Sequence, residues 1–324
     1  MPSRSDSVTC LFLGAGSSKA LAKIPIGSKF LESILNGRKE WINRDNFKIG
    51  GKSLSEWLIG VGYIELCMSY LHSLAYGHQQ ADETQNGVKI AAIRAIINVR
   101  SSIAQYLNSD HIKMLDGKQK EKNKCQELQE RLFKKFVDTT DRQLIILTTN
   151  YDLVIEKLLR AHNKPYYYPN LRCENTSETQ AGKGSIRLYK LHGSINWLEW
   201  RLMEKETGEL KSVNQPSVYI YNESLPNAEN ENGAYLFRIM EHSGRRIKTY
   251  NPVLIPFIFQ KDDWLGRQGR WKEIFREHWN CAKEQLKCSR LRIIFIGYSL
   301  PSADHHMLSW LLEILNAAKD VQVE

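Results

Sequence analysis

The sequence predicts an α/β fold built on a doubly wound parallel sheet, and three observations carry this prediction. Buried strands alternate along the chain with segments of helical periodicity. The strands are continuously apolar, as parallel strands covered by helices on both faces usually are. Polar or glycine-containing turns follow the C-terminal ends of these strands. Strands and helices that alternate in this way are typical of a doubly wound sheet.

In the N-terminal half, one strand and a long helical region are expected. Residues 8–14 form the strand, which runs through a turn at 14–18 into a helix-like segment. A mainly helical insertion is expected at about 36–135, because apolar residues recur at three- and four-residue intervals there. The charged run at 118–124 is interpreted as the solvated start of one of its helices.

The C-terminal half repeats the alternation and contains a second insertion. Strands are predicted at 143–149, 186–191, 253–257, 292–299 and 321–323, and helices at 153–161, 269–286 and 307–318. A polar insertion that bears a hairpin is predicted at about 200–250, where glycines and prolines interrupt the pattern. The three consecutive tyrosines from Tyr166 either supply a stacking wall or form an edge strand, and the edge strand is favoured.

Length and composition restrict the class of protein. The chain has 324 residues, 42% hydrophobic and 25% charged, so it can bury a core and is not disordered by composition. We expect a single domain over residues 1–324 that carries the two insertions. The longest apolar runs are too short to span a membrane, and residues 1–6 contain no apolar signal core. We therefore expect a cytoplasmic protein with no membrane partner.

Four short motifs follow four of the predicted strands. Because the carboxyl ends of parallel strands meet at one edge of the sheet, these motifs are expected to lie together, where such folds bind ligands. They occupy residues 14–18, 148–152, 192–194 and 297–299.

The first motif admits two readings. Gly14 and Gly16 allow a tight turn close to a phosphate, and Ser17 and Ser18 add hydroxyl groups at a helix N-terminus. The turn departs from the usual dinucleotide fingerprint, because Lys19 stands where the third glycine is expected. It also lacks the glycine-lysine group of a Walker loop. The motif is either a phosphate-binding turn or simply a tight turn.

Taken together, the four motifs resemble the sirtuin-like (silent information regulator) family of NAD-consuming proteins, and more narrowly its bacterial anti-phage NAD-hydrolase branch. The motifs that carry the resemblance are Gly14-Ala15-Gly16-Ser17-Ser18 with Pro25 following, Thr149-Asn150-Tyr151-Asp152, Leu191-His192-Gly193, and Gly297-Tyr298-Ser299-Leu300-Pro301 followed by Asp304. The resemblance implies a Rossmann-like domain that binds NAD as its substrate. It implies catalytic roles for Asn150 and His192. The residues it places around the NAD are Gly14, Ala15, Gly16, Ser17, Pro25, Asp152, Gly297, Ser299 and Asp304.

The chemistry of these side chains agrees with such roles. Cleavage of the nicotinamide–ribose bond passes through an oxocarbenium-like state, and the leaving group is already cationic. The reaction therefore needs a positioned ribose, a placed water and a nearby base. The amide of Asn150 can hold a water or ribose hydroxyls, and His192 titrates near neutrality and can accept a proton.

Two departures favour plain hydrolysis over protein deacylation. Sirtuin deacylases carry two cysteine pairs that bind a structural zinc, whereas none of the six cysteines here belongs to a C-x-x-C pair. We therefore expect no metal and reduced thiols. The Asp-Phe-Arg group of the deacylases is replaced by Ile26-Gly27-Ser28. The adjacent histidines His305 and His306 point in different directions on a helix and are not interpreted as metal ligands.

The resemblance also implies a biological role and partners. It implies a toxic effector of anti-phage defence, assembled as a homo-oligomer or with a second defence protein such as an ATPase, and activated by a phage-derived trigger. Two alternatives from other classes stay open: a sensor that binds NAD or ADP-ribose without cleaving it, and a nucleic-acid-binding module. The net charge, 45 − 36 = +9, bears on the last. Since only Lys19 and Lys190 lie near the motifs, we expect backbone N–H groups to hold the phosphates, and the purpose of the excess charge stays open.

Overall fold

The structure is a computed structural model of the chain. It describes residues 7–26, 28–43, 45–62, 64–76, 83–114, 119–137, 143–171, 185–204, 210–211, 218–220, 240–242, 246–254, 270–288, 290–299 and 305–324.

A six-stranded sheet in the order β13-β12-β1-β4-β6-β5 forms the centre of the molecule, and each neighbouring pair of strands is parallel. The strands are β1 (Ser7–Leu13), β4 (Gln143–Thr148), β5 (Tyr166–Tyr167), β6 (Ile186–Lys190), β12 (Arg290–Ile296) and β13 (Asp320–Val323). The predicted doubly wound α/β fold is confirmed. The tyrosine segment supplies β5 at the edge of the sheet, as the favoured reading had it.

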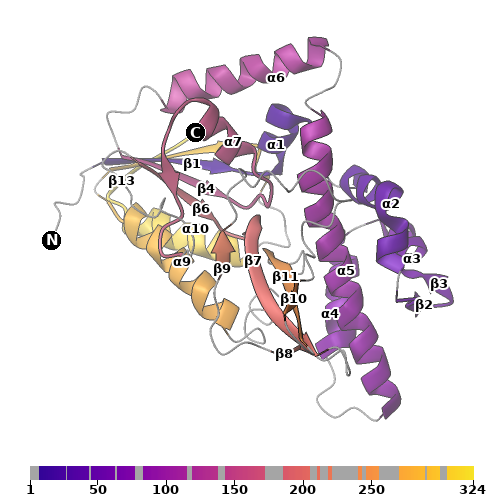
Figure 1. Ribbon diagram of the computed structural model, residues 1–324. Helices are drawn as coiled ribbons and strands as arrows, with labels where there is room; N and C mark the ends of the chain where they lie inside the picture. The colour runs from indigo at the N-terminus through magenta and orange to yellow at the C-terminus, as the bar shows by residue number, and fades with distance from the viewer. Residues whose placement is uncertain are drawn as a thin grey trace.

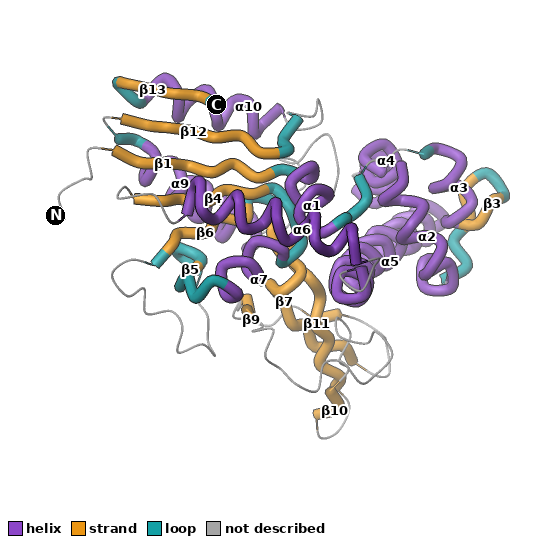
Figure 2. Tube along the Cα trace, turned by 90° about the horizontal axis from the view of Figure 1, so that it is seen from above, coloured by secondary structure: helices purple, strands orange, loops and turns teal. Residues whose placement is uncertain are grey.

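Helices cover both faces of this sheet (Figure 2). One face carries α1 (Ala15–Ala22), α6 (Gln119–Leu132) and α7 (Val154–Ala161), and the other carries α9 (Arg270–Leu286) and α10 (His305–Ala317). Alternate residues of a strand point to opposite faces. Leu11 and Leu13 of β1 accordingly belong to one hydrophobic core, whereas Cys10 and Phe12 belong to the other. Burial on both faces explains why successive residues of β1 are apolar.

The helical insertion lies beyond the carboxyl edge of the sheet (Figure 1). It contains α2 (Ser28–Asn43), α3 (Leu54–Val61), α4 (Ile64–Tyr76) and α5 (Glu83–Met114), and the π-helical turn η1 (Phe133–Val137) follows α6. A small hairpin of β2 (Lys48–Ile49) and β3 (Lys52–Ser53) was not predicted from the sequence. Gly50 and Gly51 both have positive φ and form its two-residue turn. No helix among the described ranges is long and apolar enough to cross a membrane.

The second insertion is built on two long antiparallel strands, β7 (Gly193–Glu204) and β11 (Arg246–Leu254). The short strands β8 (Leu210–Lys211), β9 (Val218–Ile220) and β10 (Met240–His242) pair with them. The long pair projects away from the parallel sheet (Figure 1). Of the strand predicted at 253–257, the first two residues complete β11, and residues 255–257 lie outside the described ranges.

The register of the parallel sheet aligns the ends of the four strands that precede the motifs. Leu13 of β1 is paired with Thr148 of β4 on one side and with Ile296 of β12 on the other, and Thr148 is paired in turn with Lys190 of β6. The turn after each strand therefore begins at the same height. From β1, the sheet continues to β4 on one side and to β12 on the other, so the strand order reverses between β1 and β12. The Gly14 and Gly297 turns follow these two strands and flank this point. Ligands of open α/β sheets bind at such a point.

Candidate active site

The glycine turn after β1 is closed by hydrogen bonds within the protein. The N–H of Gly14 donates to the Ile296 carbonyl at 3.0 Å, and the N–H of Gly16 donates to the Gly297 carbonyl at 2.9 Å. The N–H of Ser17 donates back to the Gly14 carbonyl at 2.9 Å. Three of the backbone donors expected to hold phosphates are thus occupied. A phosphate can contact them only after these internal hydrogen bonds open.

The same contacts explain the glycines. A Cβ atom on Gly14 would lie 2.5 Å from the Gly297 carbonyl oxygen, and one on Gly16 would lie 2.9 Å from the Gly297 Cα. Gly297 itself has a φ of +64°, and its own Cβ would lie 2.2 Å from the Ser17 nitrogen. The two turns approach so closely that each needs a residue without a side chain.

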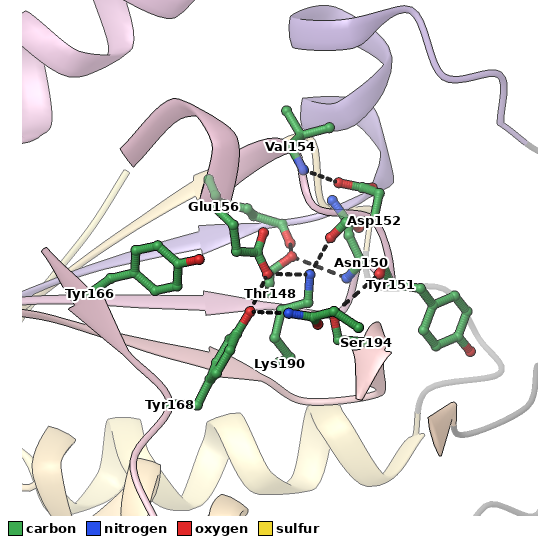
Figure 3. A network of polar contacts seen from close by, with 12 residues as sticks. Thr148, Asn150, Tyr151, Asp152, Val154, Glu156, Tyr166, Tyr168, Lys190 and Ser194 are labelled. Carbon is green, nitrogen blue, oxygen red and sulfur yellow. Dashed lines mark hydrogen bonds and ion pairs between the residues drawn. The ribbon is translucent and has the colours of Figure 1, made fainter. Parts of the chain in front are cut away.

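Asn150 is fixed at the end of β4 by its backbone and its side chain. Thr148 Oγ1 donates to the Leu13 carbonyl at 2.9 Å and accepts from the Asn150 N–H at 3.1 Å. The Asn150 amide nitrogen donates to the Gly14 carbonyl at 2.9 Å and to Ser18 Oγ at 2.8 Å. The Asn150 amide nitrogen is therefore bound to the first motif. The Asn150 side chain lies close to Asp152 (Figure 3).

Asp152 joins this cluster through Ser18. Ser18 Oγ donates to Asp152 Oδ2 at 2.7 Å, and Asp152 Oδ1 accepts from the Val154 N–H at 3.0 Å. Val154 is the first residue of α7, so the buried carboxylate lies at a helix N-terminus, where negative charge is stabilised. Ser18 bridges Asn150 and Asp152. Ser18 belongs to the first motif, but the sequence did not predict its contacts with Asn150 and Asp152.

A small cavity lies against this cluster and has room for about one water molecule. Its wall contains Ser17, Ser18, Asn150 and Asp152, together with Thr148, Lys190 and apolar side chains of β1, α1 and α7. Polar groups from three strand ends thus surround one water-sized space.

Lys190 lines this cavity and is buried. Its ammonium lies 3.0 Å from Glu156 Oε1, and both side chains are almost wholly excluded from solvent. It also donates to the Asp152 backbone carbonyl. Glu156 further accepts from the Tyr168 hydroxyl at 2.9 Å. Burial raises the pKa of Tyr168 well above its usual value, and the nearby Glu156 carboxylate adds to this, so the hydroxyl stays protonated.

His192 follows Lys190 by two residues and is 4% exposed. Its ring stacks on the His306 ring with centroids 5.8 Å apart, and the His306 ring lies 5.2 Å from that of Trp279. Trp279 Nε1 donates to the Leu191 carbonyl at 2.8 Å and so holds the neighbouring backbone. His192 does not line the cavity beside Asn150. The structure brings Ser17, Asn150 and Asp152 together, and it places His192 on the adjacent strand end facing α10.

Residues 144–233 match the family model of the SIR2-like domain. This match supports a sirtuin-like family. No curated protein matches the chain. The SIR2-like segment begins in β4 and includes Asn150, Asp152 and His192, so two of the four motifs lie inside it. It points to an NAD-related function.

The other residues expected to surround NAD lie outside the SIR2-like segment, and they differ in exposure. Ala15, Gly297 and Ser299 are exposed at the carboxyl edge of the sheet, and Pro25 is half-buried in the loop after α1, away from the cavity wall. Asp304 lies outside the described residues.

Within the described part of the chain, no group of three or more His, Cys, Asp or Glu side chains is placed to hold a metal ion. The five cysteines in that part are thiols, and Cys173 lies outside it.

Proposed function

We propose that this protein is an NAD glycohydrolase, which cleaves NAD to nicotinamide and ADP-ribose. One observation supports this function above the others: Asn150 and Asp152, both inside the SIR2-like segment, line the same water-sized cavity as Ser17 and Ser18 of the glycine turn. The cavity lies at the carboxyl edge of a doubly wound sheet, where dinucleotides bind in this class of fold.

The proposed reaction uses these groups as follows. The Asn150 oxygen orients a ribose hydroxyl or the attacking water, and the Asp152 carboxylate stabilises the positive charge that develops on the ribose. The cavity matches the size of the nucleophile, which is a single water. His192 accepts a proton from the water or from a ribose hydroxyl. The cationic nicotinamide leaves without needing a strong general acid.

The proposed biological role is that of a toxic effector in bacterial anti-phage defence, acting in the cytoplasm. It would assemble with copies of itself or with a second defence protein such as an ATPase, and a phage-derived trigger would activate it. The closed glycine turn agrees with an enzyme that is inactive before this trigger, because the Gly14 and Gly16 N–H groups are occupied by carbonyls of the protein.

A second candidate is a sensor that binds NAD or ADP-ribose without cleaving it. The observation in its favour is that the Asn150 amide nitrogen is fully used by Gly14 and Ser18, while the His192 ring faces α10. Protein deacylation ranks lower, because the chain has no C-x-x-C pair for the deacylase zinc.

The test follows NAD loss and nicotinamide release by the purified protein, with and without lysate of phage-infected cells. Asn150→Ala and His192→Ala are each expected to lower the rate by about 10²–10⁴-fold, the usual contribution of a positioned acid or base. The matched controls are Asn316→Ala, exposed in the last turn of α10, and His162→Ala at the far end of α7. Both controls are expected to retain the wild-type rate.

Three outcomes separate the candidates. Loss of activity in the two site variants alone supports hydrolysis at this site. Cleavage at the wild-type rate by both site variants contradicts the site assignment. Tight binding of NAD that stays intact under every activating condition supports the sensor instead.

A further inference from the structure

The ion pair between Lys190 and Glu156 has no role in the proposed chemistry, yet Lys190 forms part of the cavity wall. The Lys190 side chain is 0% exposed and that of Glu156 is 1% exposed. Removing two charges from water is costly, and an apolar pair of similar volume often stabilises a fold as well or better. Stability of the fold alone therefore does not explain why this pair is buried here.

The position of Lys190 in the chain suggests what the ammonium does. Lys190 is the last residue of β6, two residues before His192, and its ammonium donates to the backbone carbonyl of Asp152, two residues after Asn150. One side chain thus connects the turn that carries Asn150 to the turn that carries His192 (Figure 3).

Two backbone hydrogen bonds also join the turns after β4 and β6. The Leu191 N–H donates to the Thr148 carbonyl at 2.8 Å, and the Ile195 N–H donates to the Tyr151 carbonyl at 3.0 Å. The Asp152 carbonyl, one residue beyond the second link, is held by a side chain, the ammonium of Lys190. The ammonium therefore extends the connection between the two turns to Asp152, which lines the cavity.

Glu156 and its partners fix the ammonium in turn. Glu156 lies in the first turn of α7 and accepts from both Lys190 and the Tyr168 hydroxyl. The Asn196 amide donates to the same hydroxyl at 3.2 Å. The chain of contacts runs from β7 through Tyr168 and Glu156 to Lys190 and ends on the Asp152 carbonyl.

We infer that Lys190, held by Glu156, is a positioning residue that sets the Asn150 turn against the His192 turn. The inference rests on the proposed function. A displacement of about 1 Å between reacting groups can lower a rate by about 10²-fold. Loss of the contact is therefore expected to reduce kcat, whereas KM for NAD is expected to change little, because the Lys190 ammonium is 0% exposed and is bound by Glu156 and the Asp152 carbonyl.

The test uses the double variant Lys190→Met/Glu156→Gln in the full chain. It removes both charges together, so no uncompensated charge stays buried, and it loses the donor to the Asp152 carbonyl. The matched control is Tyr168→Phe, which removes the other hydrogen-bond partner of Glu156 and keeps the Lys190 contact with Asp152. Lys190→Met alone is also measured, and it is expected to unfold at lower urea than the double variant, because it leaves the Glu156 carboxylate buried without its cation.

Two readouts are taken on each variant: the kcat and KM of NAD hydrolysis, and hydrogen exchange of the segments 149–153 and 191–195. The double variant is expected to lose at least about 10-fold in kcat with KM within about twofold of wild type, and both segments are expected to exchange faster. Tyr168→Phe is expected to keep wild-type kcat and wild-type exchange in both segments.

The outcomes distinguish this inference from the proposed function. If the wild-type protein hydrolyses no NAD under any activating condition, the proposed function fails, and hydrogen exchange alone decides whether Lys190 holds the two turns. If the double variant shows wild-type exchange in both segments, the inference is overturned. The inference is also overturned if kcat falls in proportion to the loss of stability in both the double variant and Tyr168→Phe. The Lys190–Glu156 pair would then have a structural role only.

Discussion

Replacing Gly297 by alanine is expected to destabilise the protein more than the same replacement at another glycine with positive φ. At Gly297 the φ is +64°, and a Cβ would lie 2.2 Å from the Ser17 nitrogen and 2.4 Å from the Gly16 carbonyl carbon. Both neighbours are backbone atoms of the glycine turn, so they cannot rotate away. The alanine must therefore push the Gly297 turn and the Gly14–Ser18 turn apart.

The size of the effect follows from two contributions. A left-handed backbone conformation costs an alanine about 1–2 kcal/mol, and overpacking against the glycine turn adds about 1–3 kcal/mol. Gly297→Ala should therefore reduce the free energy of unfolding by about 2–5 kcal/mol. Alanine also restricts the unfolded chain, which offsets about 0.4–1 kcal/mol of this loss in any Gly→Ala variant.

Gly62→Ala is the matched control. Gly62 ends α3 with a φ of +74°, and the nearest atom to its Cβ would be the Ile59 carbonyl oxygen at 4.0 Å. This variant should lose only the conformational contribution, about 1–2 kcal/mol. Urea unfolding followed by tryptophan fluorescence and by circular dichroism measures both values. Equal losses in the two variants would refute the close approach of the two turns.

The remaining predictions concern three buried side chains. Burial lowers the pKa of His278 from 6.5 to about 4, so the unfolded state binds more protons between these values. The free energy of unfolding should then rise by about 3 kcal/mol from pH 4 to pH 6.5 and fall by the same amount on acidification. His278→Gln should flatten this pH dependence, as urea titrations across that range can measure. Thr148→Val removes the hydroxyl between the Leu13 carbonyl and the Asn150 N–H. It should lower the free energy of unfolding by about 1–3 kcal/mol and slow NAD loss. An unchanged rate of NAD loss would show that Asn150 does not depend on this contact. Burial raises the pKa of the Cys10 thiol, so iodoacetamide at pH 8 should leave it unmodified in the folded protein and alkylate it in urea, as mass spectrometry can check.

The fold was predictable because burial leaves a clear trace in a parallel sheet. The segments that form β1, β4, β6 and β12 are rich in buried apolar residues, and these residues pack against the helix layers on the two faces of the sheet. The β2–β3 hairpin was missed, because its strands are two residues long and one of them is mostly polar. The adjacent glycines Gly50 and Gly51 were the signal that could have revealed it.

The site was predictable in position and less so in detail. Strand ends determine where Asn150, Asp152 and His192 lie along the edge, and strand ends are visible in the sequence. Side-chain directions depend on packing between distant segments. The Asn150 amide turns toward the glycine turn, and the His192 ring turns toward His306. Neither orientation could therefore be predicted from the neighbouring sequence. Lys190 did leave one, because it is a single charge between the apolar residues Tyr189 and Leu191 at the end of a buried strand.

The position of β1 in the sheet has a consequence for protein synthesis. β1 is made long before β12, one of its two neighbours in the sheet, and the acceptors for the Gly14 and Gly16 N–H groups come from Ile296 and Gly297. A nascent chain on the ribosome has the glycine turn long before it has the turn that closes it. The complete edge of the sheet forms only after residues 290–297 have left the exit tunnel. Until then, the N–H groups of Gly14 and Gly16 lack the carbonyl acceptors that close the glycine turn in the finished fold.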